Sequence, residues 1–210
     1  MIPVQTDNPP RLVLASASPA RRALLAAAGI DVDVHVSGVD ESAVEVEDAA
    51  GLCLALARMK ARAVAATLPA DPGVLVLGCD SVLFFGGQVL GKPHTPAEAV
   101  KRWHAMRGRS GVLYTGHHLT DLVSGKQAEE VGATVVHFAD LTDEEIAAYV
   151  GSGEPLHVAG AFTIDGLGGA FVERIEGDAG NVVGLSLPLL RRLLMTFGVT
   201  VPQLWRNEDA

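Results

Sequence analysis

The sequence predicts an α/β protein in which a mixed, twisted sheet is flanked by helices within a single domain. The chain has 210 residues, of which 49% are hydrophobic, and this is enough to bury one good-sized core. Short apolar runs alternate with longer segments of helical spacing, as is typical of mixed α/β folds. No internal repeat or long linker divides the sequence, so we expect a domain over 11–200 between tails at 1–10 and 201–210.

The first half of the chain alternates strand and helix patterns. An apolar run at 12–15 predicts a strand that breaks into a loop at Ser16, and a helix over 20–28 follows. The longest helical pattern covers 48–67. The β-branched run 73–78 is too short for a helix and predicts a strand buried on both faces.

The rest of the chain continues the alternation. Residues 82–85 and 88–90 predict a hairpin with a two-glycine turn, and Pro96 predicts the start of a helix over 95–106. The remaining predicted elements are strands over 112–121 and 127–137, a helix from Thr142 to near Gly151, a strand over 171–175 and a mostly helical segment over 181–197 that contains Pro188.

The charge balance argues against one class of partner. The formal net charge is −9 at pH 7. Proteins that bind duplex nucleic acid without sequence preference need clustered Lys and Arg to neutralise phosphates. We therefore expect no duplex nucleic-acid partner, whereas a small anionic ligand needs only a few well-placed cations.

Cysteine usage and hydropathy predict a cytoplasmic protein. Cys53 and Cys79 both lie in apolar segments, which suits buried free thiols in a reducing compartment. The N-terminus lacks the basic and apolar regions of a signal peptide, and no segment has about 18 uninterrupted apolar residues. We therefore expect no membrane partner.

The loop after the first predicted strand is a candidate anion site. Ser16, Ser18, Arg21 and Arg22 lie where the strand turns into a helix. Backbone N–H groups, two hydroxyls and guanidinium groups could converge there on one anion. Alternatively, Ser18 only caps the helix and the arginines are solvated. These residues alone favour the two interpretations equally.

Two acidic positions are candidates for metal binding or catalysis. Asp80 follows a strand that we expect to be central, at the carboxyl end where open α/β sheets place ligands. Its carboxylate could be a metal ligand or a general base, or it could belong to an ordinary turn or cap. The pair Asp40-Glu41 offers hard oxygen donors that suit Mg²⁺ or Mn²⁺, although such a pair usually lies in a solvated turn.

Two lysines and the histidines complete the set of candidates. Lys92 stands between a glycine and a proline after the predicted hairpin, where its ammonium could hold a phosphate. Lys60 lies on the long helix, where a charged outer face is the ordinary interpretation. The histidines, including His117-His118, show no zinc-binding spacing and are interpreted as polar strand or loop residues.

Taken in order, these segments resemble the Maf family. The resemblance covers about 11–198 and is far more specific than any single motif. It is carried by the Ser-x-Ser-Pro-x-Arg loop at 16–21, Asp40-Glu41, Lys60, the strand end at Asp80, Gly91-Lys92-Pro93 and the segments 114–117, 153–156, 159–162, 166–169 and 181–188.

The resemblance implies both a fold and a reaction. It implies an elongated, two-lobed α/β domain with a deep cleft, related to inosine triphosphate pyrophosphatases and often found as a homodimer. It also implies hydrolysis of a nucleoside triphosphate to the monophosphate and pyrophosphate with a divalent cation, Mg²⁺ or Mn²⁺. Phosphoanhydride cleavage needs charge neutralisation and an oriented water, and the cations and carboxylates in these motifs suit both needs.

The resemblance also implies roles for individual residues. Asp80 is similar to the family's proton acceptor, and Glu41 and Asp80 together are similar to its metal-binding carboxylates. The positions expected around the substrate are Ser16, Ser18, Arg21, Lys60, Ser81, Lys92 and Asp165.

The preferred base stays open at this point. Ala20, Ser81 and Asp165 occupy the positions that distinguish the subgroup preferring dTTP and UTP from the subgroup acting on 7-methyl-GTP, and they match neither fully. Asp165 retains the acidic character of the second subgroup, and it could recognise N–H donors of a base edge or be a turn aspartate.

Two other functions remain alternatives. One is a nucleotide-binding regulator of cell division or septum formation in which hydrolysis is slow or secondary. The other is a phosphatase that removes the terminal phosphate, which needs similar cations and a similar metal. The products separate this second alternative from a pyrophosphatase.

Overall fold

The computed structural model describes residues 9–206 except 45 and 47, so 1–8 of the first expected tail and 207–210 of the second lie outside the described residues. The strands are β1 (Arg11–Leu14), β2 (Val32–Val34), β3 (Val74–Phe85), β4 (Gln88–Leu90), β5 (Ser110–Asp121), β6 (Gln127–Phe138) and β7 (Val172–Glu176). The α-helices are α1 (Pro19–Ala27), α2 (Ala49–Ala65), α3 (Pro96–Met106), α4 (Asp143–Gly151), α5 (Ala179–Val183) and α6 (Leu187–Thr196). Short 3₁₀ helices cover Glu41–Ala43, Glu154–His157, Ala159–Ala161, Leu167–Phe171 and Val201–Leu204.

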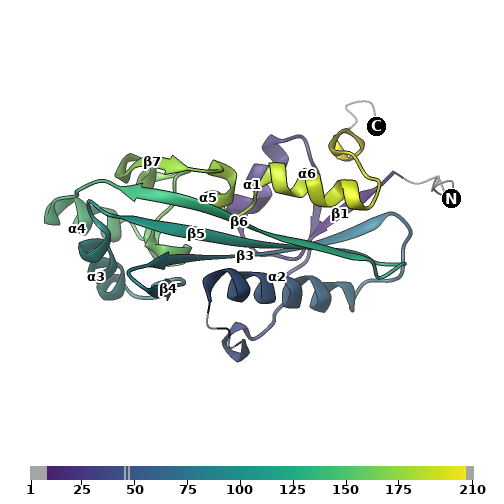
Figure 1. Cartoon of the computed structure of the whole chain (residues 1–210), viewed down its shortest axis with the longest axis horizontal. Coiled ribbons are helices and arrows are strands. Elements are labelled where there is room, and N and C mark those ends of the chain that lie inside the picture. The colour runs from purple at the N-terminus through teal and green to yellow at the C-terminus, as the bar shows by residue number, and fades with distance from the viewer. Residues whose placement is uncertain (1–8, 45, 47, 207–210) are drawn as a thin grey trace.

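The described strands form one mixed sheet in an elongated molecule (Figure 1). The strand order is β2-β1-β3-β5-β6-β7, and β4 pairs with β3 beside this path. β1 is parallel to β2 and β3, whereas every other described pairing is antiparallel. The predicted class, a mixed sheet flanked by helices, is confirmed.

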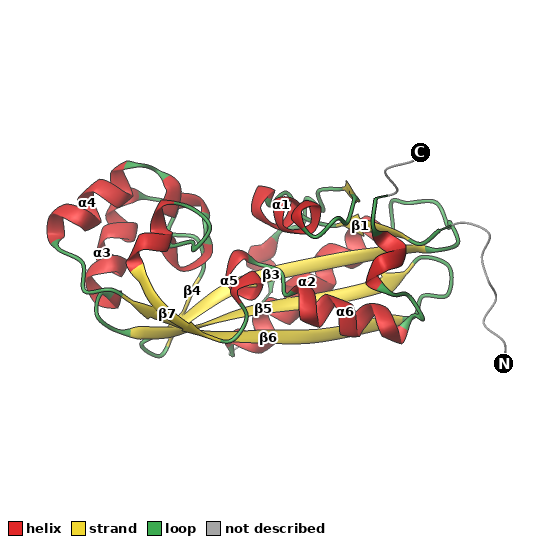
Figure 2. Ribbon diagram, turned by 90° about the horizontal axis from the view of Figure 1, so that it is seen from above, coloured by secondary structure: helices red, strands yellow, loops and turns green. Residues whose placement is uncertain are grey.

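Helices cover both faces of the three long strands. Helix α2 lies on one face, and α1, α5 and α6 lie on the other (Figures 1 and 2). Alternate residues of β3 pack against the helices on the two faces of the sheet. Val74 and Val76 pack with residues of α2, whereas Leu75 and Leu77 pack with leucines of α1 and α6. The prediction of a strand buried on both faces is therefore confirmed.

A separate core fills the other end of the molecule, where α3 and α4 lie. Trp103 is fully buried there, and its ring packs edge-on against Phe138, Tyr149 and Phe171. The indole N–H donates to the carbonyl oxygen of Ala161 at 2.8 Å. The two ends of the sheet are therefore stabilised by different cores, which gives the elongated molecule two lobes.

Helix α2 approaches the sheet closely because two adjacent strands present glycines to it. A Cβ atom on Gly78 would lie 2.1 Å from the carbonyl oxygen of Ala57, and one on Gly116 would lie 2.4 Å from that of Cys53. Neither strand could carry a side chain at these positions without displacing the helix. The close approach brings Lys60, which follows Ala57 by one helical turn, onto β3.

One predicted boundary is wrong. β3 does not end near Gly78 but continues to Phe85, because Asp80 and Ser81 still pair with β5. The segment 181–197 is mostly helical, as predicted, and it is divided in two because Gly184, with φ of 119°, ends α5 and Ser186 caps α6. Packing also extends beyond residue 200, where Leu204 is buried in a 3₁₀ helix.

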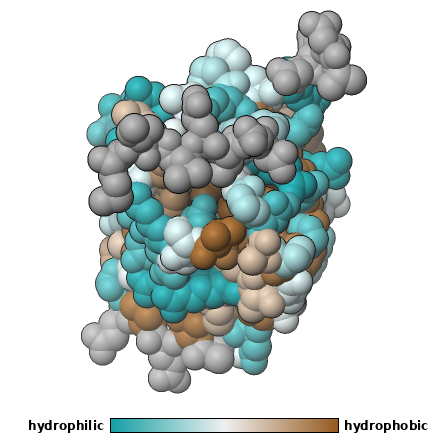
Figure 3. All heavy atoms as spheres, turned by 90° about the vertical axis from the view of Figure 1, so that its right-hand side faces the viewer, coloured by the Kyte–Doolittle hydropathy of each residue, from teal (hydrophilic) through white to brown (hydrophobic). Residues whose placement is uncertain are grey.

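The described surface has no extended apolar face. Large exposed apolar side chains occur in segments that are far apart in the sequence, and they include Val36, Val123, Met195 and Trp205. The end of the molecule near β1 and α6 is largely hydrophilic with small apolar areas between (Figure 3). Among the described helices, none is long and apolar enough to cross a bilayer.

Candidate active site

The pairing along one edge of β3 is interrupted in the middle of the strand. The pairing with β1 ends where Leu14 lies opposite Leu77, and the pairing with β4 begins where Leu90 lies opposite Leu83. Between these points, residues 78–82 have no partner strand on this side within the described part of the chain. The other edge of the same segment stays paired with β5.

Several predicted site residues lie in or beside this interruption. Asp80 and Ser81 lie within it, in the strand itself rather than after its end as the sequence predicts. Ser16 follows the end of β1. Because β4 is antiparallel to β3, the chain leaves β4 in the direction of this segment, and Lys92 follows.

The alternation of β3 directs neighbouring side chains to opposite faces of the sheet. Asp80 faces α2, where Lys60 Nζ lies 2.5 Å from Asp80 Oδ1. Ser81 faces the other side, where Arg21 Nη2 donates to Ser81 Oγ at 3.0 Å. One short strand segment thus joins two groups of charged residues.

The first group consists of Asp80, Lys60 and Glu41. Lys60 Nζ contacts Asp80 and also Glu41 Oε1, at 2.8 Å. Asp80 and Lys60 are each 8% exposed, whereas the side chain of Glu41 is 54% exposed. Burial raises the pKa of Asp80, while the positive charges of Lys60 and Arg21 oppose that rise. The ordinary interpretation of Lys60 as part of a solvated outer face is therefore wrong.

The Asp40-Glu41 pair divides between two roles. Asp40 caps the 3₁₀ helix Glu41–Ala43, and its carboxylate accepts from the Ser42 hydroxyl at 2.7 Å and the Ser42 N–H at 3.0 Å. These hydrogen bonds lower the pKa of Asp40. Glu41 is the member that reaches the buried lysine.

The arrangement of Glu41 and Asp80 suits a hard divalent cation. Both carboxylates lie within contact distance of the same lysine nitrogen, so their oxygens converge on one small region. No cluster of three or more His, Cys, Asp or Glu side chains forms a metal cage in the described part of the chain. Mg²⁺ is commonly held by one or two carboxylates, with water and substrate phosphates as its other ligands. Two converging carboxylates are compatible with that mode of binding.

The second group is organised by Arg21, which is 8% exposed. Its guanidinium donates to Ser16 Oγ at 3.0 Å, to Ser81 Oγ at 3.0 Å and through Nε to the carbonyl oxygen of Gly184 at 2.7 Å. A guanidinium has five N–H donors. These contacts use three of them, so two remain for a ligand. Ser16 Oγ also accepts from the Ser18 N–H at 3.2 Å.

Ser18 has the capping role that the sequence left as an alternative. Its side chain accepts from the Arg21 backbone N–H at 3.4 Å at the start of α1. A hollow of about 310 Å³ lies beside the same loop. Its lining residues are Ser16, Ala17, Ser18, Pro19, Arg22, Ala23, Ala26 and Val34.

Lys92 and Asp165 lie at the surface. Lys92 is exposed in the loop after β4. Asp165 is also exposed, and its carboxylate accepts a hydrogen bond from the Thr163 hydroxyl. In the described structure neither side chain contacts Asp80.

Sequence reasoning missed a hydrogen-bonded chain behind Arg21. Ser81 Oγ lies 2.9 Å from Thr115 Oγ1, and the Thr115 hydroxyl donates to the carbonyl oxygen of Asn181 at 2.9 Å. The amide of Asn181 donates to the Leu113 carbonyl oxygen and to Thr134 Oγ1. Thr115 and Asn181 both lie in segments that carry the family resemblance, but their spacing in sequence gives no sign that they meet.

Glu154 was also missed, and it organises the glycine-rich loop that carries Asp165. Its carboxylate accepts from the N–H groups of Leu167 and Gly168 and from the hydroxyl of Tyr149, each at 2.9 Å. A Cβ atom on Gly166 would lie 2.3 Å from Glu154 Oε2, so this loop needs glycine to close over the carboxylate.

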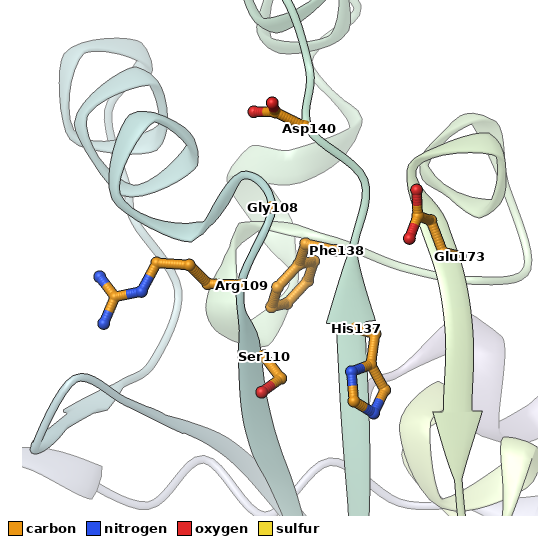
Figure 4. Close-up of a pocket in the computed structure, with 7 residues that line it drawn as sticks. All are labelled: Gly108, Arg109, Ser110, His137, Phe138, Asp140 and Glu173. Carbon is orange, nitrogen blue, oxygen red and sulfur yellow. The ribbon is translucent and has the colours of Figure 1, made fainter.

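A second hollow, of about 260 Å³, lies in the lobe that contains α3 (Figure 4). His137 borders it and pairs with Glu176 at 2.9 Å and with Arg174 at 3.1 Å. The residues that line it are Gly108, Arg109, Ser110, His137, Phe138, Asp140 and Glu173. None of them is among the predicted site residues, so this hollow is separate from the candidate active site.

The fold and these contacts define an α/β protein with two buried cations and a buried carboxylate beside an interrupted sheet edge. A family model described as Maf-like protein matches residues 11–197. The chain belongs to this Maf-like family, and the resemblance read from the sequence is confirmed.

Curated relatives match over most of their length. A protein of Salinispora tropica is 64% identical over 94% of this chain and 88% of its own. One of Streptomyces coelicolor is 58% identical over 95% of this chain and 96% of its own, and one of Streptomyces avermitilis is 57% identical over 97% and 99%. Each of these relatives is named nucleoside triphosphate pyrophosphatase.

Among solved structures, that of the Staphylococcus aureus Ham1 protein matches 62% of this chain and 72% of its own, with a TM-score of 0.40 and 15% sequence identity. A similarity of this size carries no argument about fold or function.

Proposed function

We propose that this protein is a nucleoside triphosphate pyrophosphatase, which hydrolyses its substrate to a nucleoside monophosphate and pyrophosphate. The names of its close relatives support this reaction. The observation that carries the proposal is the buried carboxylate of Asp80, which contacts Lys60 on a strand segment that is paired along one edge only. The next residue, Ser81, contacts Arg21 on the other face of the sheet. Burying these charges together has a free-energy cost that a structural role alone does not explain.

In this proposal, Asp80 accepts the proton of the attacking water. A general base works best when its pKa lies near the pH of the reaction. Burial moves the pKa of Asp80 upward, in that direction. As the water oxygen bonds to phosphorus, its proton passes to Asp80, and the P–O bond between the α- and β-phosphates breaks. The bridging oxygen leaves with pyrophosphate.

The cations bind and orient the triphosphate. The two remaining N–H donors of Arg21 can form a bidentate contact with phosphate oxygens, and Ser16 can donate its hydroxyl proton beside them. Lys60 and Lys92 supply further positive charge, and Ser18 fixes the loop by capping α1. Such fixed charges stabilise the developing negative charge without having to reorganise during the reaction.

Glu41 and Asp80 would hold a divalent cation, Mg²⁺ or Mn²⁺, against the substrate. A cation bound there supplies additional neutralisation of phosphate charge. Ser81 and Asp165 are proposed substrate contacts, Ser81 beside Arg21 and Asp165 on the loop that Glu154 holds. A homodimer is the proposed assembly, and light scattering during gel filtration would measure its mass.

The test is an assay of a nucleotide panel with Mg²⁺ and with Mn²⁺, in which products are separated by chromatography. The panel contains the standard ribo- and deoxyribonucleoside triphosphates and 7-methyl-GTP. We expect pyrophosphate and a monophosphate from at least one substrate. Asp80→Asn should lose this activity, whereas Asp40→Asn should keep it, because asparagine retains the capping role.

Other products would redirect the assignment. Orthophosphate and a diphosphate would identify a terminal phosphatase and contradict the proposal. Nucleotide binding without turnover under both metals would instead favour the regulator of cell division or septum formation.

A further inference from the structure

The guanidinium of Arg21 depends on a turn far away in the sequence. Its Nε donates to the carbonyl oxygen of Gly184, which lies 163 residues further along the chain. Gly184 ends α5 with φ of 119°, and a Cβ atom there would lie 3.1 Å from Arg21 Nε. The turn between α5 and α6 is therefore shaped around the arginine.

The same turn is held from the sheet by a buried histidine. His117 lies on β5 and is fully buried, and its Nε2 accepts from the backbone N–H of Ser186 at 2.9 Å. Its Nδ1 lies 3.0 Å from the Thr115 carbonyl oxygen, to which only an N–H can donate. Both contacts together require the neutral ring with its proton on Nδ1.

We infer that His117 is a positioning residue that fixes the Gly184–Ser186 turn and, through the Gly184 carbonyl oxygen, the guanidinium of Arg21. This inference rests on the proposed function, because it assigns Arg21 to the triphosphate. It gives a role to a histidine whose described side-chain hydrogen bonds go to Thr115 and Ser186 and not to Asp80.

The electrostatic surroundings support this arrangement. Burial, followed by the nearby charge of Arg21, lowers the pKa of His117 to about 4. The ring is therefore neutral at neutral pH and keeps the lone pair that Ser186 needs. If this lone pair were lost, the Ser186 N–H would be buried without a partner at the start of α6.

The approach to the turn from α5 is held independently. The carbonyl oxygen of Asn181 accepts from Thr115, and Thr115 in turn contacts Ser81, which accepts from Arg21. Arg21 is thus fixed along two routes that both begin on β5. His117 controls the route through Gly184, and Thr115 controls the route through Ser81.

The chain contains a matched control beside His117. His118 is also fully buried on β5, but it faces the opposite side of the sheet, where its Nδ1 lies 2.8 Å from Glu129 Oε2. Replacing either histidine by leucine removes a buried imidazole from the same strand. Only His117 is linked to Arg21.

The experiment compares kcat and KM of His117→Leu, His117→Gln, His118→Leu and Arg21→Gln, with the nucleotide that wild type hydrolyses best and Mg²⁺. We expect His117→Leu to lower kcat/KM by about tenfold to a hundredfold, since small misplacements of a binding group cost that much. Its changes in kcat and in KM should follow the pattern of Arg21→Gln. His117→Gln, whose side-chain oxygen can accept from Ser186, should recover most of the loss. His118→Leu should change kcat/KM by less than about threefold, because the contacts of His118, to Glu129 and Thr120, do not reach Arg21.

A double variant distinguishes positioning of Arg21 from a general loss of structure. His117→Leu combined with Arg21→Gln should lose little more than Arg21→Gln alone, because both changes act on one contact. Full additivity, equal losses in the two leucine variants, or no recovery in His117→Gln would each overturn the inference. If His117→Leu does not fold, His117→Gln and His117→Asn decide, because asparagine is too short to reach Ser186. Equal activity of those two would overturn the inference.

The proposed function can fail separately. If wild type hydrolyses no nucleoside triphosphate, the proposed function fails and this inference fails with it. If wild type is active and depends on Asp80, but the His117 variants behave like His118→Leu, only the inference fails.

Discussion

The two lobes bury different kinds of side chain. The lobe with α3 and α4 has an apolar core built around Trp103, and the polar indole N–H finds a carbonyl partner. The lobe with α1, α2 and α6 packs leucines and valines, but it also encloses Arg21, Lys60, Asp80 and His117. Apart from the aromatic residues Trp103 and Tyr149, none of the described buried side chains with polar atoms belongs to α3, α4, β4 or β7.

This difference separates stability from chemistry. An apolar core gains free energy from burial, whereas buried ions must recover their lost hydration through their partners. The charged lobe satisfies its ions with a small number of contacts that leave donors available for a ligand. Changes in the Trp103 lobe should therefore lower stability, and changes in the charged lobe should lower turnover.

The largest effect on stability is expected for Trp103→Ala. Removing a fully buried indole should lower the free energy of unfolding by about 3–5 kcal/mol. Urea unfolding measures this loss. At a temperature where the variant is folded, kcat/KM should stay within about threefold of wild type, since distant sites act independently. A large fall in kcat/KM of the folded variant would contradict the separation of stability and turnover between the two lobes.

The largest effect on turnover, apart from loss of Asp80, is expected for Arg21→Lys. A lysine keeps the charge but has no planar fork that can contact Ser16, Ser81 and Gly184 together. We expect kcat/KM to fall about a hundredfold, a typical loss for a displaced binding group. Steady-state kinetics measures this, with Arg191→Lys, at an exposed position of α6, as the control. Near-normal activity would show that the fork has no special role.

An intermediate effect on both quantities is expected for Gly116→Ala. The new methyl group would collide with the Cys53 carbonyl oxygen and push α2, with Lys60, away from Asp80. Overpacking of this kind costs roughly 1–3 kcal/mol of stability. The thermal unfolding midpoint and kcat/KM should both decrease. Gly151→Ala is the control, because a Cβ atom there meets no atom within 4 Å. Equal behaviour of the two variants would contradict the close-approach argument.

The smallest effect is expected for Lys92→Ala. This lysine is exposed, so water and salt screen its charge. We expect KM for the nucleotide to rise about threefold, with the effect shrinking as salt is added, and no measurable change in the unfolding midpoint. Lys101→Ala, at an exposed position of α3, should leave KM unchanged. A loss in kcat as large as that of Arg21→Lys would show instead that Lys92 acts together with the buried charges.

Local signals made most of the fold predictable. Pro96 and the capping box at Thr142 predict the helix starts that the structure has, and Gly86-Gly87 predicts the hairpin turn. The errors arose where tertiary contacts override a local signal. Asp80 is polar and interrupts an apolar run, yet β5 keeps it in the strand.

The candidate site residues could be named from the sequence, but the contacts among them could not. Lys60 has the local surroundings of a solvated lysine, and only the approach of α2 over Gly78 and Gly116 buries it. Gly184 and His117 gave no local signal, because their importance comes from contacts between distant segments.

We propose that Asp80 is buried for its role in the reaction and not for the stability of the fold. A carboxyl group whose pKa is raised by folding binds its proton more tightly in the native state. Its contribution to stability is therefore fully present below the unfolded pKa and is lost as pH rises through the folded pKa. The ionised form of Asp80 is therefore the form that destabilises the fold, and the neutral amide of Asp80→Asn avoids that cost.

The most direct measurement is made on Asp80→Asn, with kcat/KM and the thermal unfolding midpoint determined at pH 7 on the same sample. The account predicts that kcat/KM falls at least about a hundredfold, as for loss of a general base, while the midpoint stays equal to or rises above that of wild type. Retained turnover together with a lower midpoint would contradict it, because Asp80 would then serve the fold instead of the reaction.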